Sequence, residues 1–433
     1  MFFKLTIKGI KMPKEYIEVK SNHTLCGTVQ VSGAKNSALK LIAASILGQG
    51  ECILHNMPHI SDISIMSQVL LGLGARVSKN DHTLCINTKD LDSYVTPYAL
   101  VSKMRASIAV LGPLIARFGC AEVAMPGGCQ IGARKIDMHL MGLQCLGVQF
   151  VVEHGILKAH APNGLKGAEI LLEFPSVGAT ENSMMAAVVA TGETIIQNAA
   201  MEPEIADLAN MLNAMGANVS GAGSSTIVIQ GVPLESLHAC EHTCIGDRIE
   251  AATYLTGGAL TGGPVTAKGV NPDHLRMAIN KFRAMGCVVD TTEDSITISR
   301  EVSLQAVDLQ TLPHPGFPTD LQAQFMLLCS IAKGDSIIAE NLFENRFMFV
   351  AELMRMGADI SIEGHHALVR GVSKLQGAPV SSTDLRAGAS LVLAGIVAEG
   401  TTEVYDIEHI DRGYENYVGK LSALGACVRR VSL

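Results

Sequence analysis

One phrase recurs six times along this chain of 433 residues, each time as an apolar stretch that ends in glycine and is followed by a small residue or valine. The first and last copies read LLGLGARV and LSALGACV. The junction glycines are Gly74, Gly147, Gly216, Gly286, Gly357 and Gly425. They lie 73, 69, 70, 71 and 68 residues apart. Six copies at a period near 70 indicate repeated supersecondary units.

Each copy of the phrase is predicted to end a helix and to start a strand. In the first copy, Met66, Val69, Leu70 and Leu73 recur at helical spacing. Gly74 then suits the left-handed conformation that often caps a helix, and the chain resumes as an extended run. A second set of glycines, each before a predicted strand, keeps nearly the same period: Gly50, Gly119, Gly192, Gly263, Gly334 and Gly400. Every unit therefore carries at least two helices and several strands.

Units of this kind must pack together, because one unit alone cannot bury both faces of its helices and its sheet. The chain is also too long for one ordinary core, and two domains are the natural expectation. With three units in each, we expect two α/β domains.

The composition fits a compact protein whose core is mainly aliphatic. Hydrophobic residues make up 48% and charged residues 17%, and tryptophan is absent, a balance that excludes a disordered chain. The net charge of −8 argues against a nucleic-acid groove or an anionic-membrane surface as the main role, although it is compatible with a local basic pocket. The longest uncharged apolar stretch is too short to span a bilayer, and the start lacks a signal-peptide core. We therefore expect a cytoplasmic protein.

The eleven cysteines are an odd count, spread through apolar segments such as GLQCLGV and MLLCSIA, and they predict reduced core thiols without a disulfide framework. Cys129 differs, because it lies among glycines in AMPGGCQIGARKID, residues 124–137. On one interpretation this is a mobile loop in which Arg134 and Lys135 stabilise a reactive thiolate. On the other it is a glycine-rich turn whose cysteine is incidental.

The segment LHACEHTCIGD places His238, Cys240, His242 and Cys244 at alternate positions, which suggests a metal site at first sight. On one strand all four side chains would face the same way, yet a single extended strand cannot wrap four ligands tetrahedrally around one ion. The pattern therefore favours a segment that recrosses between domains over a structural zinc site.

Six further motifs carry a resemblance to a known family. They are SGAKNSAL, PGGCQIGAR, HPGFPTDLQAQ, FENRF, TDLRAGASLVLAG and HIDRGYE. From about residue 15 to the C-terminus the chain resembles the bacterial UDP-N-acetylglucosamine 1-carboxyvinyltransferases of the enolpyruvyl transferase family. The resemblance implies a two-domain inside-out α/β barrel of six βαβαββ-like repeats, three per domain, with the helices inward. It assigns 35–244 to the first domain and 13–34 plus 245–433 to the second, and leaves 1–12 as an extension.

The same resemblance implies a reaction. Members of the family transfer the enolpyruvyl group of phosphoenolpyruvate to the 3′-hydroxyl of UDP-N-acetylglucosamine by addition and elimination. Phosphate is released, no cofactor or metal is needed, and the reaction is the first committed step of peptidoglycan biosynthesis. The partners implied are these two small molecules, with neither nucleic acid nor membrane.

A metal-free site for two anionic substrates must supply several fixed cations. By resemblance, Lys35, Arg134 and Arg412 face the phosphate, and Arg346 and Arg386 hold the carboxylate. The phosphoenolpyruvate contacts implied are Lys35, Asn36, Arg134, Arg346, Arg386 and Arg412. The alternative for each arginine is an ordinary surface salt bridge.

The nucleotide-sugar contacts are also carried over by resemblance. They are Arg105, Arg134, Lys135, Ile136, Asp137, Met138, Phe174, Pro175, Ser176, Val177, Gly178, Asp320 and Leu342. Phe174 and Pro175 stand where some members have Lys-Val. We therefore expect a backbone and apolar contact to the uridine there, and no lysine contact.

Four residues are expected to act on the reacting atoms, namely Cys129, Asp320, Lys35 and Arg412. The resemblance makes Cys129 the proton donor to C3 of phosphoenolpyruvate and Asp320 the base for the sugar hydroxyl. The alternative for Asp320 is an N-cap of the helix in LQAQFMLL, and both roles are compatible. Asp384 and Glu344 are expected to orient Arg386 and Arg346 or to assist proton transfer.

Two rival functions remain at this point. One is a 5-enolpyruvylshikimate-3-phosphate synthase, which shares the fold and the donor but lacks the PGGC loop. The other is a non-catalytic nucleotide-sugar sensor on the same scaffold, which predicts loss of Cys129, Asp320 or the arginines, all of which are present.

Overall fold

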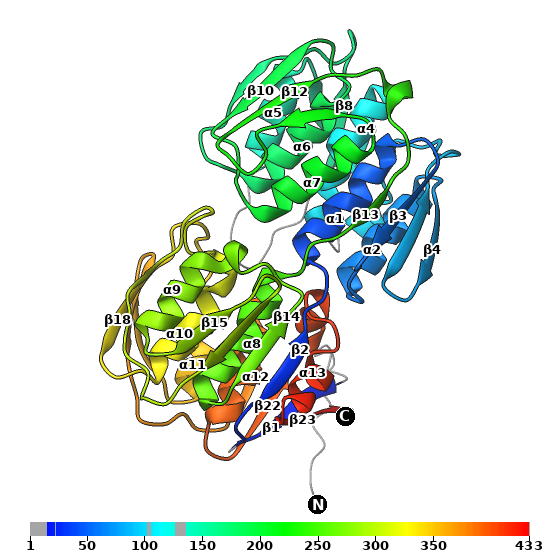
Figure 1. The fold of residues 1–433 in the computed structure, drawn as a ribbon. Coiled ribbons are helices and arrows are strands. Elements are labelled where there is room, and N and C mark those ends of the chain that lie inside the picture. Colours follow the sequence, from blue (N-terminus) through cyan, green and yellow to red (C-terminus); the bar gives the residue numbers. More distant parts are fainter. Residues whose placement is uncertain (1–14, 22, 102–104, 126–135, 433) are drawn as a thin grey trace, which may run out of the picture.

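The computed structural model describes residues 15–21, 23–101, 105–125 and 136–432, arranged as two lobes (Figure 1). Each lobe has its own hydrophobic core. One core runs from Ala34 to Cys244, and the other combines Ile17–Val31 with Ile249–Val428. We call residues 34–244 the first lobe and residues 15–33 with 245–432 the second lobe. The chain thus crosses between the lobes twice, and Gly33 and Gly246 pair at the crossing as an antiparallel bridge.

The first lobe holds three sheets among its described residues. Their strand orders are β13 (Glu241–Thr243), β3 (Glu51–His55), β5 (Thr83–Asn87), β4 (Arg76–Asn80); β6 (Cys120–Ala124), β8 (Ile156–His160), β7 (Gln149–Glu153); and β11 (Asn218–Ser220), β12 (Thr226–Gln230), β10 (Glu193–Gln197), β9 (Glu169–Leu171). The helices are α1 (Lys35–Ala44), α2 (Ser61–Gly72), α3 (Tyr98–Val101), α4 (Leu111–Phe118), α5 (Asp137–Cys145), α6 (Val177–Ala187) and α7 (Pro203–Ala214).

The second lobe repeats this plan. Its strand orders are β15 (Val288–Thr291), β16 (Ser295–Ser299), β14 (Val265–Lys268), β2 (Gly27–Gln30); β17 (Leu309–Gln310), β18 (Asp335–Ala339), β20 (His366–Arg370), β19 (Asp359–Glu363); and β21 (Pro379–Ser381), β22 (Thr401–Tyr405), β1 (Glu15–Lys20), β23 (Cys427–Ser432). The helices are α8 (Arg248–Thr261), α9 (Arg276–Ala284), α10 (Gln322–Ser330), α11 (Val350–Arg355), α12 (Leu385–Val397) and α13 (Tyr417–Ala423).

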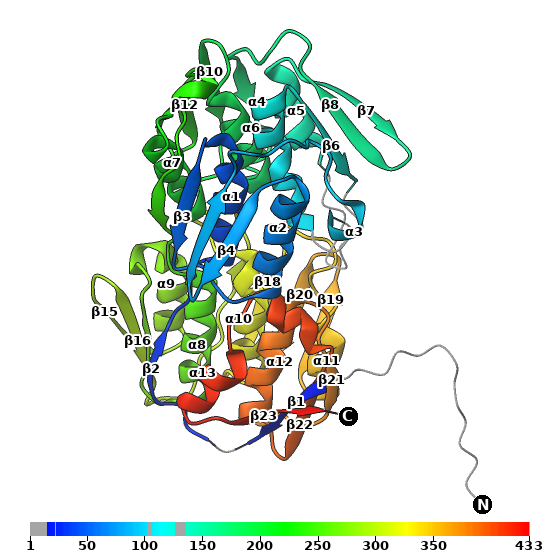
Figure 2. The same ribbon diagram turned by 90° about the vertical axis from the view of Figure 1, so that its right-hand side faces the viewer.

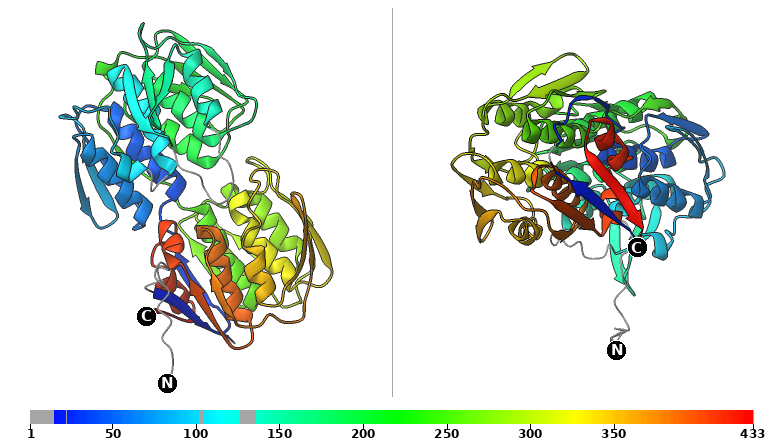
Figure 3. Two further views of the ribbon diagram at one scale, coloured as in Figure 1. Left: turned by 180° about the vertical axis from the view of Figure 1, so that it is seen from behind. Right: turned by 90° about the horizontal axis from the view of Figure 1, so that it is seen from below.

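The two strands nearest the N-terminus belong to the second lobe, far from their sequence neighbours. Strand β2 runs parallel to β14, with Thr28 opposite Thr266, and β1 lies between β22 and β23. Figure 1 shows β2 in blue beside the green β14, and Figure 3 shows the blue β1 beside the red C-terminal strand β23. The second lobe therefore closes only when both ends of the chain are in place.

The predicted helix-to-strand junction is confirmed in all six copies of the phrase. The junction glycines have φ between 92° and 101°, a region that glycine adopts without strain. A strand begins two residues after each of them, as β4, β7, β11, β15, β19 and β23. In the second glycine set the positive φ falls on Gly262 rather than Gly263, because Gly262 caps α8.

The middle of the second lobe is helical. Helices α8, α10 and α12 are buried along most of their length and contact one another. The sheets lie around them in the views of Figures 2 and 3. Among the helices that the structure describes, none has the length and apolarity needed to cross a membrane.

The cysteine prediction is right for some positions and wrong for others. The ten described cysteines are free thiols, and Cys329 of MLLCSIA is fully buried. Cys145 of GLQCLGV is exposed, however, because α5 buries Gly142 and Leu143 and turns Cys145 away from the core. Cys26 and Cys427 are exposed as well.

Candidate active site

The predicted cations of the two lobes meet at the seam between them. Lys35 is the first residue of α1, directly after the chain enters the first lobe. Arg412 ends the 3-10 helix Ile407–Arg412 in the second lobe. Both contact the carboxylate of Asp62, which lies in the first turn of α2. We call Lys35, Asp62 and Arg412 the Asp62 cluster.

The Asp62 cluster has short, well-defined contacts. Lys35 Nζ lies 3.0 Å from Asp62 Oδ2, Arg412 Nε lies 3.0 Å from Oδ1, and Arg412 Nη2 lies 3.4 Å from Oδ2. The backbone N–H of Lys35 donates to Asp247 Oδ2 at 3.1 Å, while Asp247 Oδ1 caps α8. The start of α1 is therefore held against the start of α8, which fixes where Lys35 emerges.

Burial shapes the charges of this cluster. Burial lowers the pKa of Lys35, and the nearby guanidiniums of Arg386 and Arg412 lower it further, whereas Asp62 opposes them. Burial alone would raise the pKa of Asp62, but Lys35 and Arg412 outweigh it and the pKa is lowered. The cluster therefore presents two cations and one carboxylate with a net positive charge.

Asp320 lies between two buried arginines of the second lobe. Its Oδ1 is 3.1 Å from Arg346 Nη2 and its Oδ2 is 3.4 Å from Arg386 Nη2. The arginine side chains are 2% exposed, whereas that of Asp320 is 24% exposed. The carboxylate of Asp320 is thus more accessible to solvent than the two guanidiniums that pair with it. We call Asp320, Arg346 and Arg386 the Asp320 cluster.

The helix-cap interpretation of Asp320 is wrong. Helix α10 begins at Gln322, its N-cap residue is Leu321, and no side chain caps it. Asp320 instead lies inside the short 3-10 helix Thr319–Leu321, where its carboxylate pairs with the two arginines.

Arg386 is held by its own helix and by an aromatic ring. Asp384 caps α12, and its Oδ1 accepts the backbone N–H of Arg386 at 2.8 Å. The guanidinium lies 5.2 Å from the ring centre of Tyr414. Burial would lower the pKa of Arg386, but Tyr414, Asp320 and Asp247 raise it. Its Nε and Nη1 are buried and have no acceptor within the geometric limits of a hydrogen bond among the described residues.

The described residues that are predicted to contact the nucleotide sugar come from both lobes. Ser176 Oγ accepts the Ala179 N–H at 3.4 Å and caps α6, while Phe174 is 41% exposed just before it. A Cβ at Gly178 would lie 2.6 Å from His139 Cε1, so a larger residue there would force the His139 ring to move. In the second lobe, the Leu342 N–H donates to Glu340 Oε1 at 2.9 Å.

The remaining contacts expected from the sequence lie close to these in the chain. Pro175 and Val177 flank Ser176 and are half-buried, as are Ile136, Met138 and Asn36. Asp137 is exposed at the start of α5. Cys129, Arg134 and Lys135 lie outside the described residues. Arg105 begins the 3-10 helix Arg105–Val110, but its side chain also lies outside what the structure describes.

The side chains of the His/Cys segment do not converge on one point. His242 Nε2 lies 2.8 Å from Asp207 Oδ1, and Cys244 is buried with its thiol donating to the Ala34 carbonyl. In the part of the chain with described positions, the metal-compatible group is a different one, His59, Asp81 and His82. The segment lies at the end of the first lobe, where β13 pairs with β3, directly before the chain crosses to the second lobe at Gly246.

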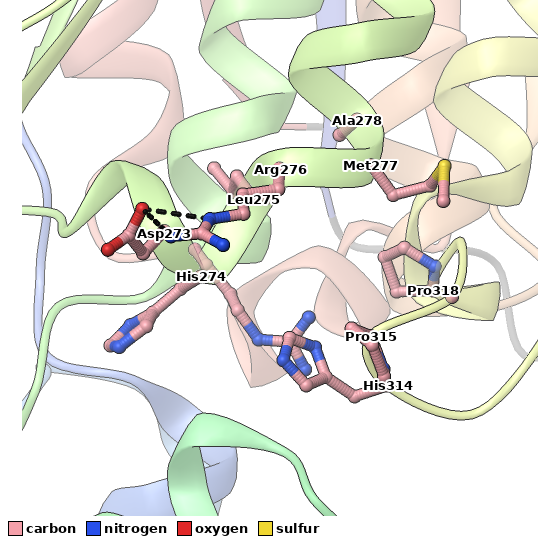
Figure 4. Close-up of a pocket in the computed structure, with 11 residues that line it drawn as sticks. Asp273, His274, Leu275, Arg276, Met277, Ala278, His314, Pro315 and Pro318 are labelled. Carbon is pink, nitrogen blue, oxygen red and sulfur yellow. Dashed lines mark hydrogen bonds and ion pairs between the residues drawn. The ribbon is translucent and has the colours of Figure 1, made fainter. Parts of the chain in front are cut away.

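A small pocket lies in the second lobe, lined in part by Pro318, which stands two residues before Asp320 in the chain (Figure 4). Arg248, His274, His314 and Pro318 are among its lining residues, and its volume is about 30 Å³. Such a volume holds about two water molecules and no nucleotide sugar. Burial, together with Arg248, lowers the pKa of His314 to about 4. This pocket is therefore a neighbour of the site and not the substrate cavity.

Sequence reasoning missed two residues of the seam, Asp62 and Arg248. Arg248 starts α8 and makes a buried pair with Glu204 of the first lobe, with Nε 3.1 Å from Oε1. Asp62 reads locally as an ordinary acidic residue in the first turn of a helix. Asp62 is buried on the same face of α2 as Ile63 and Met66. An acidic residue on the apolar face of a helix was the one sign in the sequence that could have pointed to it.

Comparisons with known proteins give a consistent result. A family model described as EPSP synthase (3-phosphoshikimate 1-carboxyvinyltransferase) matches residues 19–421. A UDP-N-acetylglucosamine 1-carboxyvinyltransferase of Gloeobacter violaceus is 50% identical over 97% of this chain and 91% of its own length. One of Desulfatibacillum aliphaticivorans is 52% identical over 96% of this chain and 99% of its own length.

Solved structures are similar over almost the whole chain. The enolpyruvyl transferase NikO of Streptomyces tendae superposes with a TM-score of 0.88 and 26% identity, covering 97% of this chain and all of NikO. An EPSP synthase of Acinetobacter baumannii gives a TM-score of 0.73 at 17% identity, covering 96% of this chain and all of that one, a likeness of fold.

Proposed function

The chain belongs to the EPSP synthase family of enolpyruvyl transferases, and from that premise we propose that it transfers the enolpyruvyl group of phosphoenolpyruvate to the 3′-hydroxyl of UDP-N-acetylglucosamine. Relatives carrying that activity in their names are about half identical over nearly their whole length. The reaction is the first committed step of peptidoglycan synthesis. Phosphoenolpyruvate and the nucleotide sugar are its partners.

The observation that carries the proposal is the meeting of four buried or half-buried cations around two carboxylates at the seam. Lys35 and Arg412 come from opposite lobes, and Arg346 and Arg386 lie beside them around Asp320. An enzyme that binds phosphate and carboxylate groups without a metal needs such fixed donors. We assign the phosphate of the donor to Lys35, Arg412 and Arg134.

The carboxylate of the donor falls to Arg346 and Arg386. The Nε and Nη1 donors of Arg386, which have no acceptor among the described residues, support this role because each can donate a charge-assisted hydrogen bond to a carboxylate oxygen. Asn36, next to Lys35 on α1, completes the donor contacts.

Asp320 acts as the base that removes the proton of the sugar hydroxyl. Its carboxylate is 24% exposed, whereas the side chains of Arg346 and Arg386 that pair with it are 2% exposed. The carboxylate is therefore the accessible member of these ion pairs, the one that a bound hydroxyl group can reach.

The chemistry then divides into two balanced steps. In the addition, the sugar oxygen bonds to C2 while C3 takes a proton from Cys129, and Asp320 holds the hydroxyl proton. In the elimination, the Cys129 thiolate takes a proton back from C3, the C–H electron pair restores the double bond, and the bond from C2 to the phosphate oxygen breaks so that phosphate leaves with the bonding electron pair. Asp384 supports Arg386 through the helix cap described above.

The nucleotide sugar spans the seam in this proposal. Contacts at Phe174, Pro175, Ser176, Val177 and Gly178 hold it on the first lobe. Further first-lobe contacts are Arg105, Arg134, Lys135, Ile136, Asp137 and Met138. Asp320 and Leu342 meet it from the second lobe, so substrate binding draws the lobes together.

We propose accordingly that 35–244 and 13–34 plus 245–433 are the two moving domains. Each would be an inside-out α/β barrel of three repeats with its helices inward. The buried trio α8, α10 and α12 supports this view for the second lobe.

Phosphate release tests the proposal. The full chain is supplied with phosphoenolpyruvate and either UDP-N-acetylglucosamine or shikimate 3-phosphate, and free phosphate is measured. We expect phosphate release when the acceptor is UDP-N-acetylglucosamine and none when it is shikimate 3-phosphate. Release only with shikimate 3-phosphate would identify the sister activity, and release with neither would leave a binding protein.

Reactivity of Cys129 gives a second test. Fosfomycin, an epoxide that mimics phosphoenolpyruvate, is expected to inactivate the enzyme and to leave one adduct on the peptide that contains Cys129. Cys129→Asp should remain active and resist the drug, whereas Cys129→Ser should resist it and be largely inactive. Full activity of Cys129→Ser would contradict the proton-donor role.

A further inference from the structure

Among the carboxylates described at the seam, Asp62 is the one that pairs with both Lys35 and Arg412, two cations predicted for the active site. It belongs to the first lobe and is 1% exposed. One of its oxygens meets the ammonium of Lys35 from its own lobe, and both meet the guanidinium of Arg412 from the other lobe. Both oxygens of a buried carboxylate are therefore used by two cations that we assign to the donor phosphate.

We propose that Asp62 is a positioning residue for the transfer reaction: it keeps Lys35 in its charged form and holds Arg412 beside it, so that the two cations meet the departing phosphate as a pair. This inference rests on the proposed function and deepens it. Asp62 itself touches neither substrate in this account, and it acts through Lys35 and Arg412.

The surroundings of Lys35 make such support necessary. Its side chain is 10% exposed, and the cations Arg386 and Arg412 lie near it, so both burial and like charge favour the neutral amine. Asp62 provides the opposite charge at 3.0 Å. If that charge is removed, the pKa of Lys35 is expected to fall, and the amine loses its proton at a lower pH.

The proposal makes a prediction opposite to that of simple charge counting. A carboxylate next to a phosphate site repels the phosphate, so removing its charge should tighten binding of the donor if attraction to the net charge were all that mattered. If Asp62 positions and charges the cations, its removal should weaken donor binding instead. The sign of the change therefore separates the two explanations.

The experiment compares Asp62→Asn with wild type between pH 6 and 9.5, using phosphate release to obtain kcat and both KM values. We expect KM for phosphoenolpyruvate at pH 8 to rise about tenfold or more, the scale for losing a hydrogen bond to a charged group, with KM for the nucleotide sugar changed less than about twofold. The alkaline limb of kcat/KM should move about one pH unit lower. Activity should recover partly towards pH 6, where Lys35 is protonated again.

Two further variants keep the test sharp. Glu415→Gln removes another carboxylate that links the lobes, at a place where it pairs with His82 and not with Lys35, and it should leave the alkaline limb unchanged. Asp62→Glu keeps the charge but lengthens the side chain, so it should retain the limb and raise KM for the donor. If Asp62→Asn does not fold, a wild-type donor KM in Asp62→Glu overturns the proposal on its own.

An unchanged or lower donor KM in folded Asp62→Asn, with the wild-type alkaline limb, would also overturn it. Failure of the proposed function looks different, because wild type would then release no phosphate with either acceptor.

Discussion

Two ion pairs join the lobes across the seam, and they differ in how far they are buried. Asp62 of the first lobe, 1% exposed, holds Arg412 of the second. Glu415 of the second lobe, 12% exposed, pairs with His82 of the first, which is 40% exposed. Charges attract more strongly where water is excluded. The buried contact can therefore fix protonation and position, whereas the outer one can contribute little beyond a weak, titratable link.

The outer contact is nevertheless well formed. Glu415 Oε1 lies 2.8 Å from His82 Nε2 and 3.8 Å from His59 Nδ1. Glu415 Oε2 accepts a hydrogen bond from the backbone N–H of His59 at 2.9 Å. The two imidazole rings stack at 4.2 Å. Two contacts with equally short distances can therefore contribute differently when one is exposed and the other is buried. Substitutions at Glu415 and at buried charged residues measure this difference.

The largest expected effect comes from the Asp320 cluster, whose two arginines are 2% exposed. Asp320→Asn keeps the shape of the side chain but removes the base, so kcat should fall at least about 100-fold, the usual scale for general base catalysis. Steady-state phosphate release checks the rate, and circular dichroism checks that the protein is folded. Glu415→Gln is the matched control and should keep the wild-type kcat. Near-normal turnover in Asp320→Asn would remove Asp320 from the chemistry.

A second buried pair across the seam should matter for stability. Arg248 and Glu204 are 6% and 3% exposed, and the guanidinium donates to both carboxylate oxygens, at 3.1 Å and 3.3 Å. Arg248→Met leaves Glu204 buried without its partner, and breaking such a pair costs about 3–5 kcal/mol of unfolding free energy. Urea unfolding measures this change.

The control for that prediction is the double variant Arg248→Met with Glu204→Leu. It removes both charges, so most of the lost stability should return. If the double variant were as unstable as the single one, packing around Arg248 and not the uncompensated charge would be the cause.

The sequence predicts the repeating parts of this molecule well, because they depend on local chemistry. Each junction glycine is set by a left-handed cap that few other residues adopt, and the six positions can be read from spacing alone. Cys145 shows the limit of this reasoning. An apolar segment does not say which face of its helix is buried, and Cys145 lies on the exposed one.

Contacts between the lobes are harder to predict for a physical reason. Asp62 and Arg412 are 350 positions apart, and no periodicity relates them. Asp320 stands before a helix, where a cap and an ion pair look the same in the sequence. The resemblance to a family suggested Lys35, Asp320 and the arginines as site residues, but not the carboxylate that joins Lys35 to Arg412.

The smallest expected effect belongs to the outer contact, and its sign with pH can be worked out. Burial would lower the pKa of His82, but its hydrogen bonds with Glu415 and Asp81 outweigh burial and raise it. A raised pKa means that the folded state binds the proton more tightly than the unfolded state. The stabilisation is thus complete below the ordinary histidine value of 6.5 and is lost as the pH rises through the raised pKa of the folded state.

Glu415 sets the acid end of the same window. Burial would raise its pKa, but the His59 N–H and His82 outweigh burial and lower it. Its contribution is present above the ordinary glutamate value of 4.5 and is lost as the pH falls through the lowered one. Glu415→Gln should therefore reduce the unfolding free energy most at about pH 5.5–6, by less than about 1 kcal/mol because the contact is exposed.

Towards pH 9 this loss should shrink, since less of His82 stays protonated to pair with Glu415 as the pH rises. Thermal unfolding of wild type and Glu415→Gln across pH 5 to 9 measures it. Glu408→Gln, which removes an exposed carboxylate seven positions earlier, serves as the control and should show no such pH dependence. A loss that grows towards pH 9, or one as large as that of Arg248→Met, would mean that the outer contact behaves like a buried one and that depth does not separate the two.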